Sequence, residues 1–409
     1  MDRGRPKIPA NNAKRCEGVI AALRAMILDG RWQPGAQLPT RMELIRSLKT
    51  TPVTLHHAVQ RLVNDGFLRT APGAGTYVVD TPSHLNTYAV VFSFDPVARG
   101  AELNWSRYYQ ALTQATVRLQ QETGRRMLMF HGIDQHGDSE DRARLITYIE
   151  RQRLAGVIFT NSPYLLHDTP ILDMPGIPRV AMASSQQYAH VPIMNLDFAM
   201  WVDKALDHLA ALGRRRVAII DIGVEPEFTA QLNAGLAARG MISHPRWTQL
   251  VDMRRPDGAR HDVELLMHDR ERPDALLIND DNFVEHALAG LAASGVRVPA
   301  WGEPGRTEDV AVVGHANFPL APTKILPVRL LGYDANLMLR TCVDLIDRQR
   351  RGEQVPGETL LPALWEEEVP NAELRNAERG TRSAKCGTEE CGTRSAGRRQ
   401  PCSWRTRAD

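Results

Sequence analysis

From Tyr88 onward, short apolar segments alternate with amphipathic segments, and this alternation restricts the fold more than any other feature of the chain. Apolar segments that predict strands lie at residues 88–94, 126–130, 156–162 and 179–185. Segments with helical periodicity lie between them, near residues 108–122 and 140–151. Strands that alternate with helices form βαβ units with parallel strands. The first half of this region is therefore predicted to be a parallel sheet covered by helices.

The second half of the region repeats the arrangement. Predicted strands lie at residues 216–223, 275–281 and 310–315, with helices near residues 201–212, 230–239, 263–268 and 284–294. Two such series predict an α/β body of two lobes, residues 88–369, each built on a doubly wound parallel sheet. Ligands of open α/β sheets bind beyond the carboxyl ends of the strands. Two facing lobes are therefore expected to enclose a ligand-binding cleft.

The chain before the body follows a different pattern, since residues 12–80 predict three helices and then two strands. Thr40 is a suitable N-cap for a short second helix, and Thr51 for a third helix that begins with Pro52. The third helix carries an apolar stripe at i, i+3, i+4, i+7 and i+8. Two strands around residues 71–74 predict a small wing. This head is therefore a predicted winged helix-turn-helix, joined to the body by a linker at residues 81–87.

The exposed face of the third helix carries Val53 and His57, flanked by Thr54 and His56. Such a face can enter the major groove of DNA, although a three-helix unit can also be a protein-interaction module. Either histidine can equally be a solvated surface residue. Adjacent residues on a helix point about 100° apart and do not share a metal site, so we expect no metal here.

The charge of the chain is unevenly distributed, and this supports DNA binding by the head. Residues 1–80 hold 12 Lys and Arg against 6 Asp and Glu, whereas residues 81–369 hold 29 against 37. A basic head on an acidic body indicates a localised site for a polyanion.

The head resembles the GntR family of winged-helix regulators. The resemblance runs from about Lys14 to Val79 and rests on three motifs: ILDGRWQPGAQLPTRMEL, VTLHHAVQRLVNDGFLRT and GAGTYVV. It implies that the third helix enters the major groove and that the wing reaches the minor groove. By this resemblance the expected DNA contacts are Thr40, Arg41, Thr51, Val53, Thr54, His56, His57, Gly73 and Gly75, with the three threonines on phosphates.

Three positions of the head depart from that family. Met42, Pro52 and His56 stand where the family usually carries arginines, some of which read guanines. Arg41 is expected to substitute in part. The base preference of relatives therefore does not transfer to this chain.

The body resembles the LacI/GalR ligand-binding domain, which is itself similar to periplasmic sugar-binding proteins. The resemblance rests on ordered segments, among them NLDFAMWVDKALDHLAALGRRRVAII, RPDALLINDDNFVEHALAGLAASGVRVP and LLGYDANLMLRTCVDLI. A sensor body of this type behind a GntR-type head is typical of arabinose-type repressors. The combination implies a regulator with a small, sugar-like effector.

The resemblance also places candidate effector contacts. Asp281 occupies the acidic position of the family's Asn-Asp pair, where a carboxylate accepts hydrogen bonds from sugar hydroxyls; alternatively, it only caps the next helix. Trp105 is a candidate to stack on a sugar face, or else a surface or core aromatic. Asp197 and Asn317 are further candidates. Leu232 stands where the family has an effector-binding arginine, and Gly314-His315-Ala316 replaces its usual Gly-aromatic-Asp.

These observations predict a ligand-controlled, cytoplasmic transcription regulator that binds double-stranded operator DNA as a homodimer. The alternative is a regulator whose body only dimerises and binds no effector. We expect no enzyme, because the chain lacks a P-loop, a G-x-S-x-G elbow and an H-E-x-x-H motif. We also expect no cofactor, no metal and no membrane partner. The tail, residues 370–409, is basic and poor in apolar residues, and is predicted to be disordered.

Overall fold

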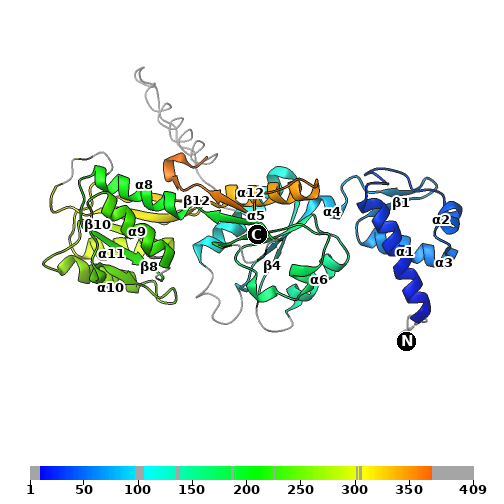
Figure 1. The fold of residues 1–409 in the computed structure, drawn as a ribbon, viewed down its shortest axis with the longest axis horizontal. Helices are drawn as coiled ribbons and strands as arrows, with labels where there is room; N and C mark the ends of the chain where they lie inside the picture. Colours follow the sequence, from blue (N-terminus) through cyan, green and yellow to red (C-terminus); the bar gives the residue numbers. More distant parts are fainter. Residues whose placement is uncertain are drawn as a thin grey trace, which may run out of the picture. The chain divides into compact units, whose positions relative to one another are not determined.

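The computed structural model describes residues 10–370, except residues 97–105, 135–138, 186–187, 189, 224–225, 301–302 and 304–305. The chain divides into two units, residues 1–367 and 368–409. Trp105 and the predicted tail from residue 371 onward lie outside the described residues. The head and the two lobes described below belong to the first unit (Figure 1).

The head is a winged helix-turn-helix, as predicted. Its elements are α1 (Ala10–Leu28), α2 (Arg41–Ser47), α3 (Pro52–Asn64), β1 (Leu68–Ala71) and β2 (Gly75–Val78), and the two strands pair antiparallel. Thr51 is the N-cap of α3 and accepts a hydrogen bond from the Thr54 backbone, with Pro52 at the first helical turn. The three helices and the strands bury one apolar core around Leu23, Leu62 and Phe67.

The linker differs in detail from the prediction. Residues 83–86 form a one-turn helix, α4 (Ser83–Asn86), and the first strand of the body starts at Thr87. The ring of His84 in α4 stacks on the ring of Phe67 in the head, with 5.3 Å between the ring centroids. The linker is therefore a packed segment.

The N-terminal lobe is a six-stranded parallel sheet with the order β13-β7-β6-β5-β3-β4. Its strands are β3 (Thr87–Val91), β4 (Arg126–Phe130), β5 (Gly156–Phe159), β6 (Arg179–Met182), β7 (Ile193–Leu196) and β13 (Glu358–Leu361). The helices α5 (Arg107–Thr123) and α12 (Ala335–Arg350) share one apolar cluster with the sheet. The helices α6 (Glu140–Glu150) and α7 (Pro170–Asp173) contribute to a second cluster. The sheet is thus covered by helices on both faces.

The C-terminal lobe has the strand order β14-β12-β11-β10-β8-β9. Its strands are β8 (Val217–Asp221), β9 (Thr248–Leu250), β10 (Ala275–Ile278), β11 (Ala311–Phe318), β12 (Arg329–Asp334) and β14 (Leu364–Trp365). All pairs are parallel except β12 with β14. The helices α8 (Phe198–Ala211), α9 (Pro226–Ala238), α10 (Gly258–His268) and α11 (Asp281–Ala293) surround this sheet in Figure 1. The doubly wound two-lobed prediction is confirmed.

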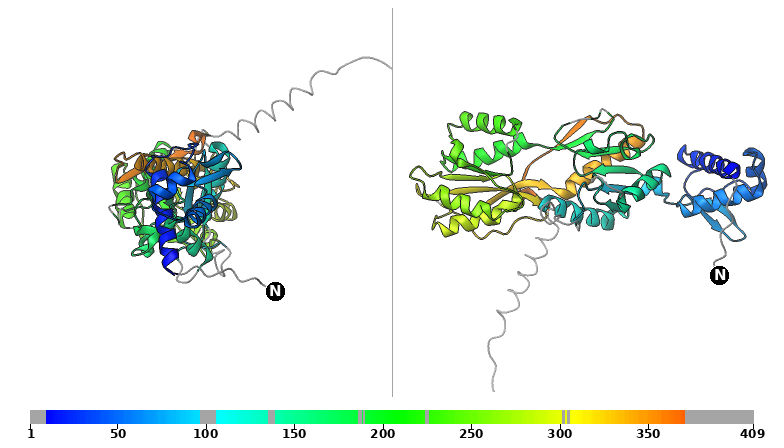
Figure 2. Two further views of the ribbon diagram at one scale, coloured as in Figure 1. Left: turned by 90° about the vertical axis from the view of Figure 1, so that its right-hand side faces the viewer. Right: turned by 90° about the horizontal axis from the view of Figure 1, so that it is seen from below.

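The chain crosses between the lobes three times, after β7, after β12 and after β13. These connections can be followed in the right-hand view of Figure 2. Each crossing is only a few residues long, so each lobe is built from segments that lie far apart in the sequence. Three short connections between two compact lobes form a hinge.

Candidate functional site

The N-terminus of α3 is built by two threonines. The Thr51 and Thr54 hydroxyls lie 2.9 Å apart, and the Thr51 hydroxyl also accepts from the Thr54 backbone. One of the two hydroxyl protons is sufficient for that contact, so the other remains to be donated outward. The capping residue of α2, Thr40, donates its hydroxyl to the Glu43 carboxylate over 2.8 Å, and these contacts lower the pKa of Glu43.

Beyond these caps, the residues of α3 that are fully exposed include no Lys, Arg, Asp or Glu. The Val53 side chain is 65% exposed, and His56 and His57 are exposed beside it. From α2, Met42 is 60% exposed, and Arg41 donates to the Pro52 carbonyl over 2.9 Å. Arg41 therefore ties the first turns of α2 and α3 together.

Two glycines shape the tip of the wing. Gly73 and Gly75 have φ angles of 73° and 120°, which L side chains rarely adopt. Gln37 donates to the Ala74 carbonyl over 2.8 Å, and the Arg69 guanidinium lies 4.8 Å from the Tyr77 ring centroid. The tip is thus held in place against the loop before α2.

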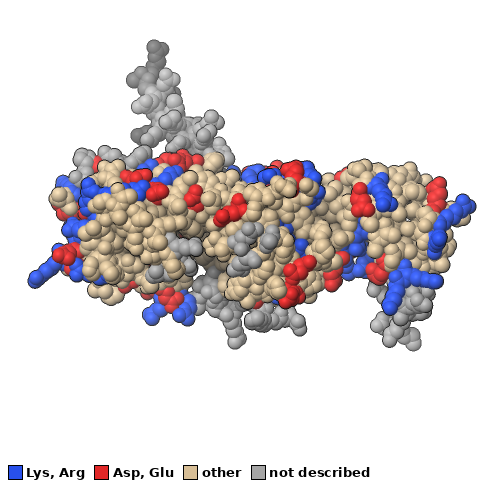
Figure 3. All heavy atoms as spheres, in the orientation of Figure 1, with Lys and Arg blue, Asp and Glu red and all other residues tan. Residues whose placement is uncertain are grey.

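Positive charge accompanies this surface. Arg41, Arg46 and Lys49 are exposed on α2 and the turn that follows it. Figure 3 shows Lys and Arg side chains projecting from the side of the head on which α2 lies. Exposed cations around an uncharged helix face are typical of proteins that hold phosphates at the edge and bases at the centre.

A cavity of about 530 Å³ lies between the two lobes. The N-terminal lobe contributes Tyr108, Ser184, Asn195, Leu196 and Leu360 to its wall, and the remaining lining residues are Asp197, Phe198, Ala199, Asp221, Ile222, Gly223, Phe228, Gln231, Asn279, Asp280, His315 and Asn317. The cavity lies beyond the carboxyl ends of β7, β8 and β10, where an α/β lobe presents its ligand groups. Its volume fits a small molecule.

The structure places Asp281 differently from our expectation. Asp281 is 1% exposed and does not line the cavity, whereas the preceding residue, Asp280, does. Asp280 is the N-cap of α11, so the first turn of the helix carries Asp281 inward. The acidic wall group is therefore Asp280, and the sequence position alone could not separate the two neighbours.

Asp281 supports a cavity residue instead. Its Oδ2 accepts from the backbone N–H and from the side-chain Nδ2 of Asn317, both over 3.0 Å. Burial, followed by the neighbouring charge of Asp280, raises the pKa of Asp281 to about 7. Asn317, an expected contact, does line the cavity, and Asp281 fixes which way its amide faces.

A second asparagine is oriented in the same manner. The Asn279 Nδ2 donates to the Asp221 Oδ2 over 3.0 Å, which leaves the Asn279 Oδ1 as the outward acceptor. Asn279 and Asp221 were not singled out from the sequence. Asp221 ends the apolar strand β8 and Asn279 directly follows the apolar strand β10, and these positions at strand ends could have identified both residues.

Asp197, another expected contact, also lines the cavity. Its Oδ1 accepts from the Met200 backbone over 2.9 Å, so it caps α8 at the first crossing between the lobes. Asp197 thus combines a structural role with a place on the wall.

The two departures from the expected motif have clear positions. Leu232 is buried in the core, whereas Gln231 lines the cavity. His315 lines the cavity from β11, and burial lowers its pKa to about 4, which keeps the ring neutral at pH 7. The positions of the expected arginine and carboxylate are thus taken by two buried apolar residues, Leu232 and Ala316, while Gln231 and His315 add polar groups to the wall.

A polar cluster in the N-terminal lobe was missed in the sequence. The Ser93 hydroxyl lies 2.6 Å from the Asp134 Oδ2 and 2.5 Å from the Asn161 Oδ1. Burial raises the pKa of Asp134. These residues follow β3, β4 and β5, at the same edge of the sheet as the cavity.

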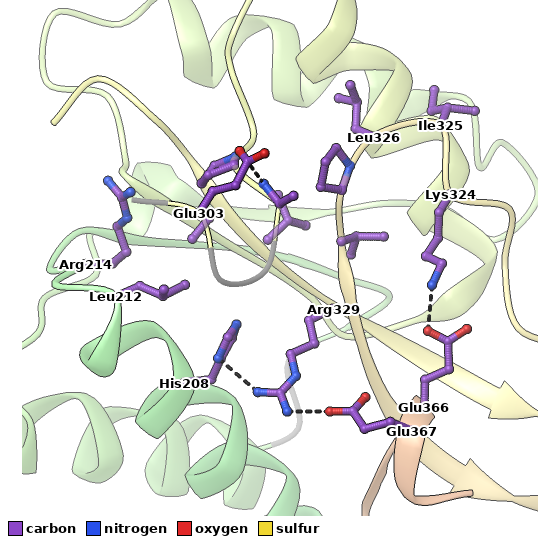
Figure 4. A pocket seen from close by; sticks show the side chains of 16 residues that line it. His208, Leu212, Arg214, Glu303, Lys324, Ile325, Leu326, Arg329, Glu366 and Glu367 are labelled. Atoms are coloured by element: carbon purple, nitrogen blue, oxygen red, sulfur yellow. Dashed lines mark hydrogen bonds and ion pairs between the residues drawn. The ribbon is translucent and has the colours of Figure 1, made fainter. Parts of the chain in front are cut away.

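A second cavity, of about 460 Å³, lies at the opposite edge of the C-terminal lobe, near the amino ends of β11 and β12 (Figure 4). Its charges are largely paired. Arg329 lies 3.0 Å from the His208 Nδ1 and 2.5 Å from the Glu367 carboxylate, and Lys324 lies 2.6 Å from Glu366. Burial and then Arg329 lower the pKa of His208 to about 4. Such a network of paired charges is typical of ion pairs that stabilise a fold rather than of a ligand-binding site.

The described residues lack two further features. No group of three or more His, Cys, Asp or Glu side chains there is arranged to hold a metal ion. No helix there is long and apolar enough to cross a membrane.

Comparison with known proteins identifies the head. The family described as bacterial regulatory proteins, gntR family, matches residues 16–78. The arabinose metabolism transcriptional repressor of Geobacillus stearothermophilus is 24% identical over 72% of this chain and 80% of its own length. The repressor of the same name from Halalkalibacterium halodurans is 21% identical over 81% of this chain and 90% of its own length.

Comparison with solved structures identifies the fold of the body. A protein described as a LacI transcriptional regulator, from Bacillus cereus subsp. cytotoxis, superposes with a TM-score of 0.51 and 16% identity, over 68% of this chain and 96% of that one. A LacI family transcriptional regulator from Bifidobacterium animalis subsp. lactis gives a TM-score of 0.50 and 18% identity, over 69% of this chain and 96% of that one. Residues 16–78 therefore match the gntR family of bacterial regulatory proteins, and they precede a body whose fold is similar to that of LacI-family regulators.

Proposed function

We propose that this chain is a DNA-binding transcription regulator whose affinity for its operator is controlled by a small polyhydroxylated effector in the cleft between the lobes. The observation that carries the proposal is the joining of a gntR-family head to a two-lobed body with a polar cleft at its hinge. Relatives over most of the chain are named as arabinose repressors, so L-arabinose is the first effector to test. The chain acts by binding and not as an enzyme.

In the head, α3 lies in the major groove with Val53, His56 and His57 against base edges. Thr51, Thr54 and Arg41 hold the backbone, and Gly73 and Gly75 let the wing approach the minor groove. Thr40 can bind a phosphate only by giving up its bond to Glu43. Two heads of a homodimer then read a palindrome whose half-sites lie about one helical turn apart, or a multiple of that.

Coupling between cleft and head runs along α12. This helix begins at the second crossing, where Asp334 is its N-cap, and ends near the linker, where Arg350 donates to the Leu85 carbonyl over 3.2 Å. The neighbouring His84 stacks on Phe67 of the head. Closure of the lobes on an effector would displace α12 and with it the linker, which changes the spacing of the two heads.

The test is a selection of DNA sequences by the full chain from a random pool, followed by anisotropy titrations of the selected site with and without sugars. We expect a palindromic site and a change in DNA affinity of 5–150-fold on effector binding, the range of about 1–3 kcal/mol typical of such coupling. Val53→Glu places a negative charge on the recognition face and should abolish DNA binding, while Leu265→Glu, at a 59% exposed position of α10, should not.

The alternative, a body that only dimerises, predicts a different outcome. The selected site would still be palindromic, but no sugar would bind the chain or change its affinity for DNA. Protection of a single asymmetric half-site would instead contradict the dimer.

A further inference from the structure

The cleft offers hydrogen-bond acceptors more readily than donors. The Oδ1 atoms of Asn279 and Asn317 are buried and have no hydrogen-bond partner among the described residues. Both amides are held in this orientation from behind, because each Nδ2 donates to a carboxylate, of Asp221 and Asp281 respectively. Asn317 is only 4% exposed. A buried acceptor without a donor is costly, so these two atoms indicate a ligand that donates.

Carboxylates add to the acceptors on the same wall. Asp197, Asp221 and Asp280 all line the cavity. Within the described part of the chain, Asp197 and Asp280 use only Oδ1 in hydrogen bonds, to the first turns of α8 and α11, which leaves the Oδ2 of each for a ligand. Three carboxylates thus face one volume of about 530 Å³.

Positive charge is scarce in the same place. No Lys or Arg is among the described lining residues, and His315 is neutral. The charge of Arg107 acts on Asp280, but Arg107 pairs with Glu285 over 2.6 Å and donates its backbone N–H to Asn282. Its charge is therefore largely compensated by Glu285, so the described lining residues offer no cation to Asp197 and Asp280.

We infer that the effector carries a protonated amine together with hydroxyl groups, as an amino sugar does; this inference rests on the proposed function of the cleft. An ammonium group donates up to three hydrogen bonds and accepts none. It therefore matches a site in which Asn279, Asn317 and Asp280 all present acceptors. An acidic sugar is disfavoured, because its carboxylate would lie among carboxylates of the same charge.

The electrostatics of the cleft agree with this choice. Burial, and to a smaller extent the charge of Asp221, raises the pKa of Asp280. A cation bound at this wall would favour the ionised carboxylates and so lower their pKa values. The pKa of Asp280 should therefore be lower with an amino sugar bound than with its neutral parent.

The experiment is isothermal titration of the full chain with matched pairs of sugars. The pairs are D-glucose and D-glucosamine, D-galactose and D-galactosamine, and D-mannose and D-mannosamine, with L-arabinose and D-galacturonate added. We expect one amine to bind at least tenfold more tightly than its parent, because a charge-assisted hydrogen bond is about twice as strong as a neutral one.

Variants assign the preference to the wall. Asp280→Asn and Asp197→Asn keep the capping oxygen but remove the charge, so each should reduce the tenfold preference for the amine while the affinity for the parent sugar changes little. Asp168→Asn, at an 86% exposed carboxylate that contacts His167, is the matched control and should change neither affinity.

The outcomes separate the two proposals. Equal or tighter binding of a neutral sugar, or of galacturonate, would overturn the amine inference and leave the proposed function intact. Failure of every sugar and amine to bind, with unchanged DNA affinity, would overturn both. An amine preference that persists in Asp280→Asn and Asp197→Asn would also overturn the role of this wall.

Discussion

Replacement of Asp281 by alanine separates a supporting carboxylate from a ligand-binding one. The side chain is 1% exposed and lies outside the wall of the cleft, with Oδ2 bound to two donors of Asn317. If Asp281 only supports Asn317, its loss should destabilise the C-terminal lobe first. Effector affinity should fall as a secondary effect, because the Asn317 amide is then free to turn.

The magnitude follows from the two donors left behind. A buried donor without an acceptor costs about 1–3 kcal/mol, so Asp281→Ala should lower the free energy of unfolding by roughly 2–6 kcal/mol. The alanine variant also avoids the cost of burying a charged carboxylate, a cost shown by the pKa of about 7, and this offsets part of the loss. The loss at pH 8 should therefore lie in the lower half of that range. Asp281→Asn keeps an oxygen that can replace Oδ2 and accept from both donors, so it should lose less than half as much.

Urea unfolding followed by tryptophan fluorescence measures the stability, and isothermal titration measures effector affinity. The reasoning is refuted if Asp281→Ala unfolds at the same urea concentration as the parent chain yet no longer binds effector. That result would place the carboxylate in direct contact with the ligand. A loss of stability in Asp281→Ala as small as that in Asp281→Asn would also contradict the role of the two Asn317 donors.

Four further predictions address the head, the linker, the pH dependence and the tail. Thr51→Ala removes the N-cap of α3 and should lower the free energy of unfolding by about 1 kcal/mol, measured by thermal unfolding. It should also weaken DNA binding, whereas Thr51→Ser should retain both the stability and the DNA affinity. His84→Ala should leave effector binding and DNA binding intact in separate assays but abolish the effect of one on the other, since it removes the stack on Phe67; unchanged coupling would refute the proposed route. Burial lowers the pKa of His84, His208 and His315 to about 4, below the usual value of about 6.5. The folded state therefore binds fewer protons than the unfolded chain, and the free energy of unfolding should fall as the pH drops from 7 to 5. The raised pKa of Asp281 acts in the opposite direction, so urea titrations at each pH should show a steeper loss for Asp281→Asn than for the parent chain. Deletion of the residues after Asn371 should leave the melting temperature and the effector response unchanged, and a large drop in melting temperature would show that the tail packs.

Local patterns in the sequence were sufficient for the architecture of the head and of most of the body. Capping residues and apolar stripes depend only on neighbours within a few positions, so Thr51, Pro52 and the stripe of α3 could be placed correctly. The same holds for β3, β4, β5 and β6, whose apolar segments are continuous. Parallel strands buried on both faces leave that signature in the sequence.

The short strands β13 and β14 were not predicted from the sequence, for a physical reason. β13 and β14 have four and two residues and alternate between buried and exposed side chains. They become strands because β7 and β12 offer them hydrogen-bonding partners across a long separation in the chain. No local window contains that information. The same separation hides the cluster of Ser93, Asp134 and Asn161.

The sequence predicted which strand end carries the site, but not which side chain lines the cavity. The segment after β10 carries three consecutive polar residues, Asn279, Asp280 and Asp281, and sequence reasoning chose the last. The choice depends on where the first turn of α11 begins, and a shift by one residue rotates a helical side chain by about 100°. Because Asp280 caps the helix, it stays at the wall, and Asp281 turns toward β11 and Asn317.

The position of Asp281 behind the wall also explains how the cleft can be both rigid and selective. A layer of carboxylates behind the wall, Asp221 and Asp281, fixes the asparagine amides, so their orientation does not have to be established by the ligand. Fixed acceptors bind donors without the entropic cost of ordering flexible side chains. Asp197 on the same wall caps α8 directly at a crossing between the lobes. A ligand that draws Asp197 toward Asn279 and Asn317 therefore acts on the hinge itself. From the hinge, α12, which begins at the second crossing, reaches the linker.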